Sequence, residues 1–187
     1  NVGAYPITVS GGVSGNYDFN YVSGTLTIAK ATLLATANNQ TRTYGAANPT
    51  LTITYSGFAN GETSSVLDVL PSTSTTAVAT SPVGGYPIQV TGGSDGNYEI
   101  APLSGTLTIT KATLTATAVN TSRPYGSANP TFTISYSGFQ NGENATVLDT
   151  APEANSAAVL TSDVGIYPIT VSGGADANYT LTYVDGT

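Results

Sequence analysis

One stretch of sequence, present three times, decides the fold. It reads Val2-Gly-Ala-Tyr-Pro-Ile-Thr-Val-Ser-Gly-Gly12, and close copies begin at Val83 and Val164, each 81 residues after the one before. At this offset, residues 30–106 and 111–187 are identical at 45 of 77 positions, with no insertion. The period exceeds the roughly 20–50 residues of a solenoid repeat and suits a small β-sandwich domain. The sequence therefore predicts tandem domains.

Each repeat is expected to consist of β-strands. Apolar and polar residues alternate in Leu51-Thr-Ile-Thr-Tyr55 and in Phe132-Thr-Ile-Ser-Tyr136, and Gly92-Gly93 is a turn signal. About seven short antiparallel strands per repeat indicate an all-β fold, with tandem immunoglobulin-like β-sandwich modules in an elongated rod. In the second segment we expect strands near residues 31–38, 50–56, 66–70, 75–80, 85–91, 97–102 and 105–110.

The period divides the chain into three segments. Residues 1–29 correspond to the C-terminal part of a module and hold its last two or three strands. Residues 30–110 correspond to a complete module, and residues 111–187 to a module without its last strand. Because the chain begins at Asn1 without an initiator methionine, we expect it to be a piece of a longer or processed protein.

The junction between repeats carries a change of pattern. Residues 106–118 contain neither glycine nor proline. Apolar side chains occupy odd positions at Leu107 and Ile109 but even positions from Ala112 onward. In a strand, a shift of one residue sends side chains to the opposite face. We therefore expect the last strand of one module to run directly into the first strand of the next, with the core face switching near Lys111 and a stiff junction.

The composition argues against several classes of chemistry. The chain has no His, Cys, Met or Trp, which removes the common zinc and haem ligands, the thiol nucleophile and the Ser-His triad. Four basic residues and a net charge of −7 do not suit binding to nucleic-acid phosphates. No apolar run approaches the ~18–20 residues of a membrane span. We therefore expect no catalysis, no cofactor, no metal site, no nucleic-acid partner and no membrane insertion.

Two tyrosines are the candidate ligand contacts. Tyr21 and Tyr183 stand out because the matching position of the middle repeat is Pro102, and an exposed aromatic ring can stack on a sugar. The tyrosines that recur in the repeats are expected instead to lie in the core or at corners, with their hydroxyls bonded to nearby backbone.

Recurring charged residues are expected to serve the fold. Asp95-Gly-Asn97 is typical of a turn, and the chain lacks the clustered carboxylates that calcium sites need. Glu62 and Asp68 are candidates to pair with Arg42 or Lys30. An exposed pair of this kind would contribute only about 0–1 kcal/mol.

Several short motifs recur together. They are Lys30-Ala-Thr-Leu33, Tyr44-Gly45, Asn48-Pro49, Tyr55-Ser-Gly-Phe58, Asn60-Gly-Glu62, Tyr86-Pro-Ile88, Asn97-Tyr98 and Gly105-Thr-Leu-Thr-Ile109. In this combination the chain resembles, over its whole length, the MBG-type Ig-like module of bacterial surface proteins, the variety named for its Tyr-Gly signature. The resemblance implies a tandem module of large secreted or surface-anchored proteins, often adhesin-like, and it implies no catalytic or ligand site.

Three functions remain open. We favour a structural stalk or fibre segment of an extracellular or cell-surface bacterial protein, which projects or tethers adhesive parts. One alternative is a weak multivalent adhesin array that binds a host or matrix glycan or protein. The other is a filament subunit, in which neighbouring copies join head to tail and a strand of one chain completes the last module of the next by β-augmentation. That strand consists of Thr25, Leu26, Thr27, Ile28, Ala29 and Lys30.

Overall fold

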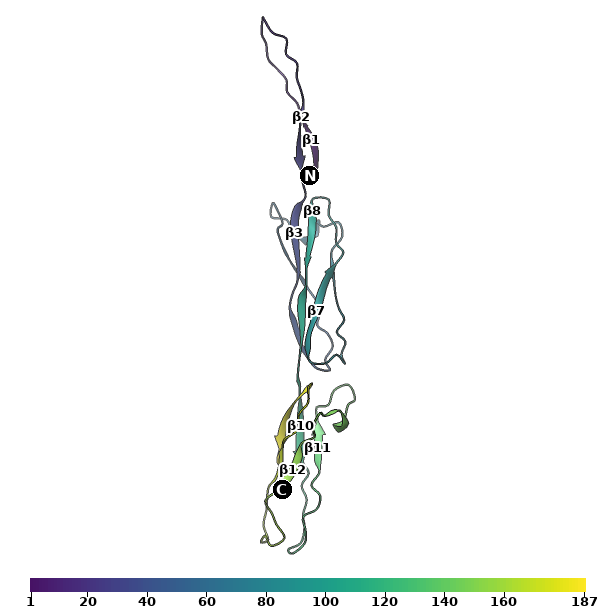
Figure 1. Cartoon of the computed structure of the whole chain (residues 1–187), viewed down its shortest axis with the longest axis vertical. Coiled ribbons are helices and arrows are strands. Elements are labelled where there is room, and N and C mark those ends of the chain that lie inside the picture. The colour runs from purple at the N-terminus through teal and green to yellow at the C-terminus, as the bar shows by residue number, and fades with distance from the viewer. The chain divides into compact units, whose positions relative to one another are not determined.

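The computed structural model describes all residues, 1–187, and it is built from β-strands, as predicted (Figure 1). Its two helices are single 3₁₀ turns at Ser64–Val66 and Ala145–Val147, and neither has the length or hydropathy to cross a bilayer. The strands are β1 Gly3–Ile7, β2 Gly24–Ile28, β3 Ala31–Ala37, β4 Gln40–Thr43, β5 Ile53–Ser56, β6 Ser72–Thr75, β7 Gly84–Thr91, β8 Tyr98–Leu103, β9 Gly105–Thr110, β10 Ala112–Ala118, β11 Ile134–Ser137, β12 Glu153–Ser156, β13 Ile169–Ser172 and β14 Tyr179–Val184.

The contacts group the chain into two compact units. Unit 1 holds Asn1–Asn38, Leu51–Thr75 and Ile88–Gly105, and unit 2 holds Asn39–Thr50, Thr76–Pro87 and Thr106–Thr187. The division falls within the middle module, residues 30–110, and not at a junction between modules. The junction at Lys30 therefore lies inside unit 1, and the junction at Lys111 lies inside unit 2.

Unit 1 has a packed core between two sheets. Strand β3 pairs antiparallel with β5 and parallel with β8. Figure 1 shows β3 and β8 side by side. Strand β6 pairs with residues 88–91 of β7. Apolar side chains of β3, β7 and β8 alternate toward the core, as period-two patterns require. The buried residues are Leu33, Ala35, Ile88, Val90 and Tyr98. Strands β1 and β2 form a separate two-stranded hairpin.

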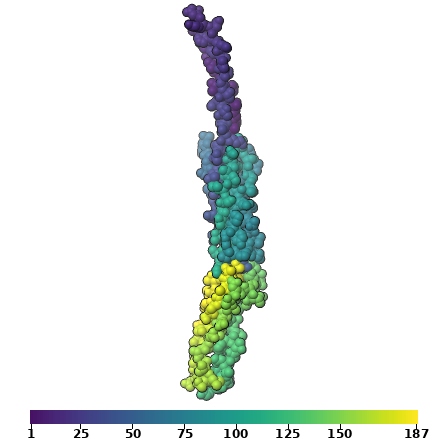
Figure 2. All heavy atoms as spheres, in the orientation of Figure 1, coloured from purple at the N-terminus to yellow at the C-terminus, as the bar shows by residue number.

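Unit 2 holds one end of the middle module and all of the last module, residues 111–187. Strand β4 pairs parallel with β9, which lies beside β7. In the last module one sheet has the order β11-β10-β14 and the other pairs β12 with β13. Figure 2 shows the yellow C-terminal strand running beside the green chain of the same unit. The core between these sheets contains Ala116, Ala118, Ile169 and Val171, with Phe132, Ile134, Tyr136, Ala154 and Leu181 packed against it.

The predicted change of phase at Lys111 is confirmed. Strand β9 buries Leu107 and Ile109, whereas β10 buries Ala112 and every second residue after it. Lys111 alone separates the two strands. The strand that closes one module therefore becomes the first strand of the next, with its buried side reversed.

Two strand predictions are wrong, and one strand was missed. Residues 66–70 form no strand, because Val69 makes only an isolated bridge to Ser94 and the apolar side chains around it are exposed. Residues 75–80 lie mostly in a turn, where backbone carbonyls accept hydrogen bonds from side chains, and the strand lies earlier, at Ser72–Thr75. Strand β4 was not predicted.

The expectation of purely antiparallel pairing is also wrong in part. In three sheets, a strand from the beginning of a module pairs parallel with a strand from the end of the same module. The pairs are β3 with β8, β4 with β9 and β10 with β14. The chain passes from one sheet to the other between β3 and β4. Asn38 bonds Thr52 and Thr54 on one side, and Asn39 accepts from the Thr106 amide on the other.

Candidate functional site

The motifs that recur in each repeat meet at the junction between modules. The Tyr44 hydroxyl, from the end of the middle module, donates to Glu143 Oε1 of the last module at 2.6 Å. The Tyr179 hydroxyl donates to the other oxygen, Oε2, at 2.5 Å, and it accepts from the Gln140 amide at 2.8 Å. The rings of Tyr44 and Tyr179 meet edge to face, with centroids 5.6 Å apart. One carboxylate therefore joins a tyrosine of its own module to a tyrosine of the preceding module.

The shared carboxylate changes the acidity of both phenols. The hydrogen bond to Glu143 and partial burial raise the pKa of Tyr44. Burial, followed by the hydrogen bond to Glu143, raises the pKa of Tyr179 to about 12. Both shifts have one cause in common, because a phenolate beside a carboxylate would lose a hydrogen bond and face a like charge. The junction therefore favours the neutral, protonated form of both tyrosines.

Gly45 explains the second half of the Tyr-Gly motif. Its backbone has φ +81°, a left-handed conformation that favours glycine. A Cβ atom at this position would lie 2.4 Å from Cβ of Gln140, in the next module. At Gly126, the matching residue of the last module, φ is +79° and nothing lies within 4 Å. The left-handed turn is thus common to both copies, and the close approach belongs to the junction.

Backbone atoms are also joined across both junctions. The Val83 amide donates to Oδ1 of Asn178 at 2.9 Å, and Val2 donates to Asn97 at 3.0 Å. The same bond therefore recurs one period apart. Asn97 and Asn178 are held in place by turns in which an aspartate oxygen accepts two amide hydrogens.

The end of the middle module contains a buried arginine without an acidic partner. Arg42 is 6% exposed, and its guanidinium donates to Asn48 Oδ1 and to the carbonyl of Val78. Asn48 in turn donates to the carbonyl of Ala77. These bonds anchor the loop at residues 77–78 to β4. The Arg42 and Asn48 motif residues therefore have a structural role, and Arg123 makes the matching bonds in the last module.

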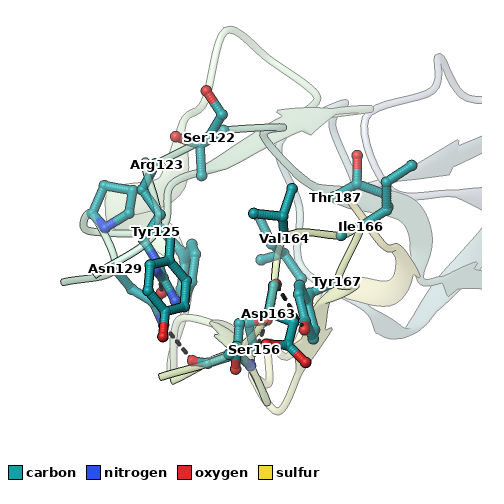
Figure 3. A pocket seen from close by; sticks show the side chains of 17 residues that line it. Ser122, Arg123, Tyr125, Asn129, Ser156, Asp163, Val164, Ile166, Tyr167 and Thr187 are labelled. Carbon is teal, nitrogen blue, oxygen red and sulfur yellow. Dashed lines mark hydrogen bonds between the residues drawn. The ribbon is translucent and has the colours of Figure 1, made fainter. Parts of the chain in front are cut away.

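The last module has an open groove where the middle module has strand β9. Its volume is about 290 Å³. Figure 3 shows Ser122, Arg123 and Tyr125 on one side and Val164 and Tyr167 on the other. The matching residues of the middle module lie in and next to β4 and β7, the two neighbours of β9. The groove of the last module therefore corresponds in position to β9 of the middle module.

Comparison with known protein families decides the classification. The model of the MBG domain, YGX type, matches residues 1–27, 33–108 and 114–187 in three consecutive segments. The chain belongs to the MBG domain family. No curated protein and no solved structure matches it. The family consists of non-catalytic repeat domains of surface proteins, and its Tyr-Gly signature is the pair Tyr44-Gly45 at the junction described above.

The two tyrosines predicted as ligand contacts lie at equivalent places in their MBG modules. Tyr21 is 43% exposed and Tyr183 is 42% exposed. Their hydroxyls donate to the carbonyls of Gly11 and Gly173, respectively, and Tyr21 stacks on Phe19. The structure does not bring the two together with other candidate residues, and their role in binding stays a prediction.

One set of the recurring tyrosines makes the expected hydroxyl-to-backbone bonds, whereas Tyr17 and Tyr125, 77% and 65% exposed, do not lie in a core. The hydroxyls of Tyr5, Tyr86 and Tyr167 each donate to the carbonyl four residues earlier. Tyr98 accepts from the Ala59 amide, but it also donates to Glu62, a bond that was not predicted.

The predicted ion pairs of Glu62 are wrong. Glu62 accepts from Tyr98 and contacts neither of the two predicted cations. Lys30 donates to the backbone carbonyl of Asp95 at 2.6 Å. The Arg42 guanidinium donates to Asn48 Oδ1 and to the carbonyl of Val78. The reason is local, because backbone carbonyl oxygens at nearby turns accept hydrogen bonds from each cation.

Proposed function

We propose that this chain is a stalk segment of a secreted or cell-surface bacterial protein, and that its MBG modules carry tension while they project or tether adhesive parts. Membership of a family of surface-protein repeats supports the location. The observation that carries the proposal is the parallel pairing of β4, the second strand of the middle module, with β9, its last strand.

A parallel pair of strands resists a force that pulls the two ends of the module apart. The chain enters the middle module through β3 and β4 and leaves it through β9 into β10. A force applied to the two ends pulls β4 and β9 in opposite directions along their length. Their hydrogen bonds are then loaded in shear and break together. In an antiparallel pair pulled from one end, the bonds would instead open one after another.

The junction supports the same role. Lys111 alone separates β9 from β10, so force passes from one module to the next without a flexible linker. The bonds of Tyr44 and Asn178 hold the neighbouring module in a fixed place. A tether built in this way transmits load through strands from end to end.

Proline substitutions in β4 provide the test. Amide hydrogens of a strand point alternately to either side. The Tyr44 amide donates to the Thr110 carbonyl at 2.8 Å, so those of Arg42 and Gln40 face β9 and that of Thr43 faces away. Gln40→Pro therefore removes a bond to β9, and Thr43→Pro removes none. The last module already has Pro124 at the position that matches Thr43.

The measurement is single-molecule force spectroscopy of the full chain held by its two ends. We expect Gln40→Pro to lower the force at which the middle module unfolds, and Thr43→Pro to leave it unchanged. If Gln40→Pro unfolds at the wild-type force, the shear-loaded pair of strands does not carry the load and the tether proposal loses its basis.

A further inference from the structure

We propose that the end of the middle module unfolds together with the last module, as one cooperative unit that is out of phase with the sequence repeat. This end comprises residues 39–50, 76–87 and 106–110, and we call it the shared end. The inference goes beyond the tether function and does not depend on it, because it concerns which residues open together and not the force that the chain withstands.

The last module is attached to three neighbouring strands of the middle module, in the sheet order β4-β9-β7-β6. Tyr44 directly follows β4, and its hydroxyl donates to Glu143 Oε1 at 2.6 Å. Val83 directly precedes β7, and its amide donates to Asn178 Oδ1 at 2.9 Å. Strand β9 lies between β4 and β7 and continues through Lys111 into β10. The last module therefore bonds to both neighbours of the strand that leads into it.

One turn of the last module makes several of these attachments. The Asp176 carbonyl accepts from Lys111 Nζ at 2.7 Å, and the Asn178 carbonyl accepts from the Ala112 amide at 2.9 Å. The same turn presents Asn178 Oδ1 to Val83. It directly precedes β14, which pairs with β10 along the sheet of the last module. The turn therefore keeps these three oxygens in place only while the last module is folded.

Side-chain packing joins the same two parts. Tyr44 is 5% exposed, and its ring meets the Tyr179 ring of the last module edge to face. Phe139 meets Tyr179 in the same way, with centroids 5.5 Å apart. Such aromatic pairs stabilise a structure beyond the area that they bury. Gly45 lies so close to Gln140 that an added Cβ would be 2.4 Å from Cβ of Gln140. The side chain of Tyr44 thus has its hydrogen bond and its ring contact in the last module.

The rest of the middle module is packed within unit 1. Strand β3 pairs with β5 and β8, and β6 pairs with residues 88–91 of β7. The side chains of Leu33, Ala35 and Ile88 are fully buried there. These strands have a core and hydrogen-bond partners of their own, and the bonds to the last module described above do not involve them. We therefore expect them to open separately from the shared end.

The contacts make the fold of the shared end depend on the fold of the last module, and the reverse. If either part opened alone, the bonds from Tyr44 to Glu143 and from Val83 to Asn178 would break, and the Tyr44 ring would lose its contact. The loss is the same whichever part opens first, because a coupling free energy is reciprocal. Amides of parts that open together exchange with one common free energy of opening.

The experiment is native-state amide hydrogen exchange of the full chain, followed by NMR over a series of low denaturant concentrations. Protected amides of β3, β9 and β10 report on unit 1, the shared end and the last module. We expect β9 and β10 to converge on one free energy of opening and one dependence on denaturant, and β3 to converge on another. The measurement applies no force, so its outcome is independent of the test of the tether.

Two double variants test whether the bonds of the joint cause this coupling. The joint variant combines Tyr44→Phe with Asn178→Ala. The control variant combines Tyr125→Phe with Asn97→Ala, the same substitutions at the matching repeat positions away from this joint. Neither variant removes an apolar side chain from a core. We expect the joint variant to raise the exchange rates of β9 at least tenfold and to separate them from those of β10, and the control variant to leave both unchanged.

Three results would overturn the proposal. In the first, β9 of the wild-type chain opens with β3, which would place the boundary at Lys111 as the sequence repeat does. In the second, all three strands open in a single event. In the third, β9 and β10 still open together in the joint variant, which would mean that the bonds of Tyr44 and Asn178 do not couple them.

Discussion

Tyr44 and Glu143 stand 99 residues apart in the sequence and are joined by a 2.6 Å hydrogen bond between neighbouring MBG modules. The carboxylate also accepts from Tyr179, so it connects the preceding module to the core of its own. This arrangement gives the Tyr-Gly and Asn-Gly-Glu motifs a common purpose. They specify the joint between modules, and the sandwich cores depend on other residues.

Removal of the Tyr44 hydroxyl should loosen the joint and leave the modules folded. A hydrogen bond to a charged group contributes about 1.5–3 kcal/mol. We expect Tyr44→Phe to lower the free energy of local opening by about 1.5 kcal/mol, measured by amide hydrogen exchange at Gln140. The control is Tyr125→Phe, because the Tyr125 hydroxyl makes no bond within the chain. Equal exchange rates in the two variants would show that the bond does not hold the joint.

Alkaline pH should remove the stabilisation that the neutral form of Tyr179 provides. In the unfolded chain a tyrosine ionises near its ordinary pKa of 10.0, whereas in the folded chain the pKa of Tyr179 is about 12. A raised folded-state pKa means that the stabilisation is complete below pH 10 and disappears as the pH rises to about 12. NMR titration of tyrosines labelled at Cζ measures this directly.

The variant Glu143→Gln tests the cause of these shifts. It removes the main influence that raises the pKa of Tyr44, so Tyr44 should ionise at lower pH than in the wild-type chain. Tyr55 is the internal control, because burial alone raises its pKa and no carboxylate contributes. An unchanged Tyr44 titration in this variant would rule out the hydrogen bond as the cause.

Two matched glycines separate backbone strain from contact between modules. Gly45→Ala and Gly126→Ala both place a side chain in the left-handed region, at a cost of about 1 kcal/mol each. Only the first puts a Cβ against Gln140. We expect Gly45→Ala to lower the melting temperature of the joint-forming region further than Gly126→Ala does. Equal losses in calorimetry would mean that Gln140 moves aside freely.

The sequence predicted those elements whose burial follows from period-two patterns. The phase change at Lys111 is the clearest case, because the alternation of apolar residues reports directly which face is buried. Strand β4 was missed for the opposite reason. Its sequence, Gln40-Thr-Arg-Thr43, has no apolar residue, and its place in the sheet depends on Arg42, which is buried only because Asn48 and a loop carbonyl satisfy it.

The joint could be anticipated only in part. Tyr44 and Glu62 each recur after one period, which marks both positions as structural. The sequence does not reveal that the tyrosine of one module bonds the glutamate of the next, because pairing within a module and pairing between modules predict the same recurrence. The distance from the tyrosine to each glutamate in the folded chain decides between the two pairings. That distance depends on how the module that follows β9 is placed.

A fixed joint between MBG modules is the central claim, and the absence of cysteine makes a direct test simple. Spin labels at Thr108→Cys and Thr170→Cys lie on exposed strand positions on either side of the joint, in the same compact unit. Labels at Thr133→Cys and Thr170→Cys, within the last module, provide the reference width. We expect the distance distribution across the joint to be as narrow as the reference in the wild-type chain and broader in Tyr44→Phe. A broad distribution in the wild-type chain would contradict the account.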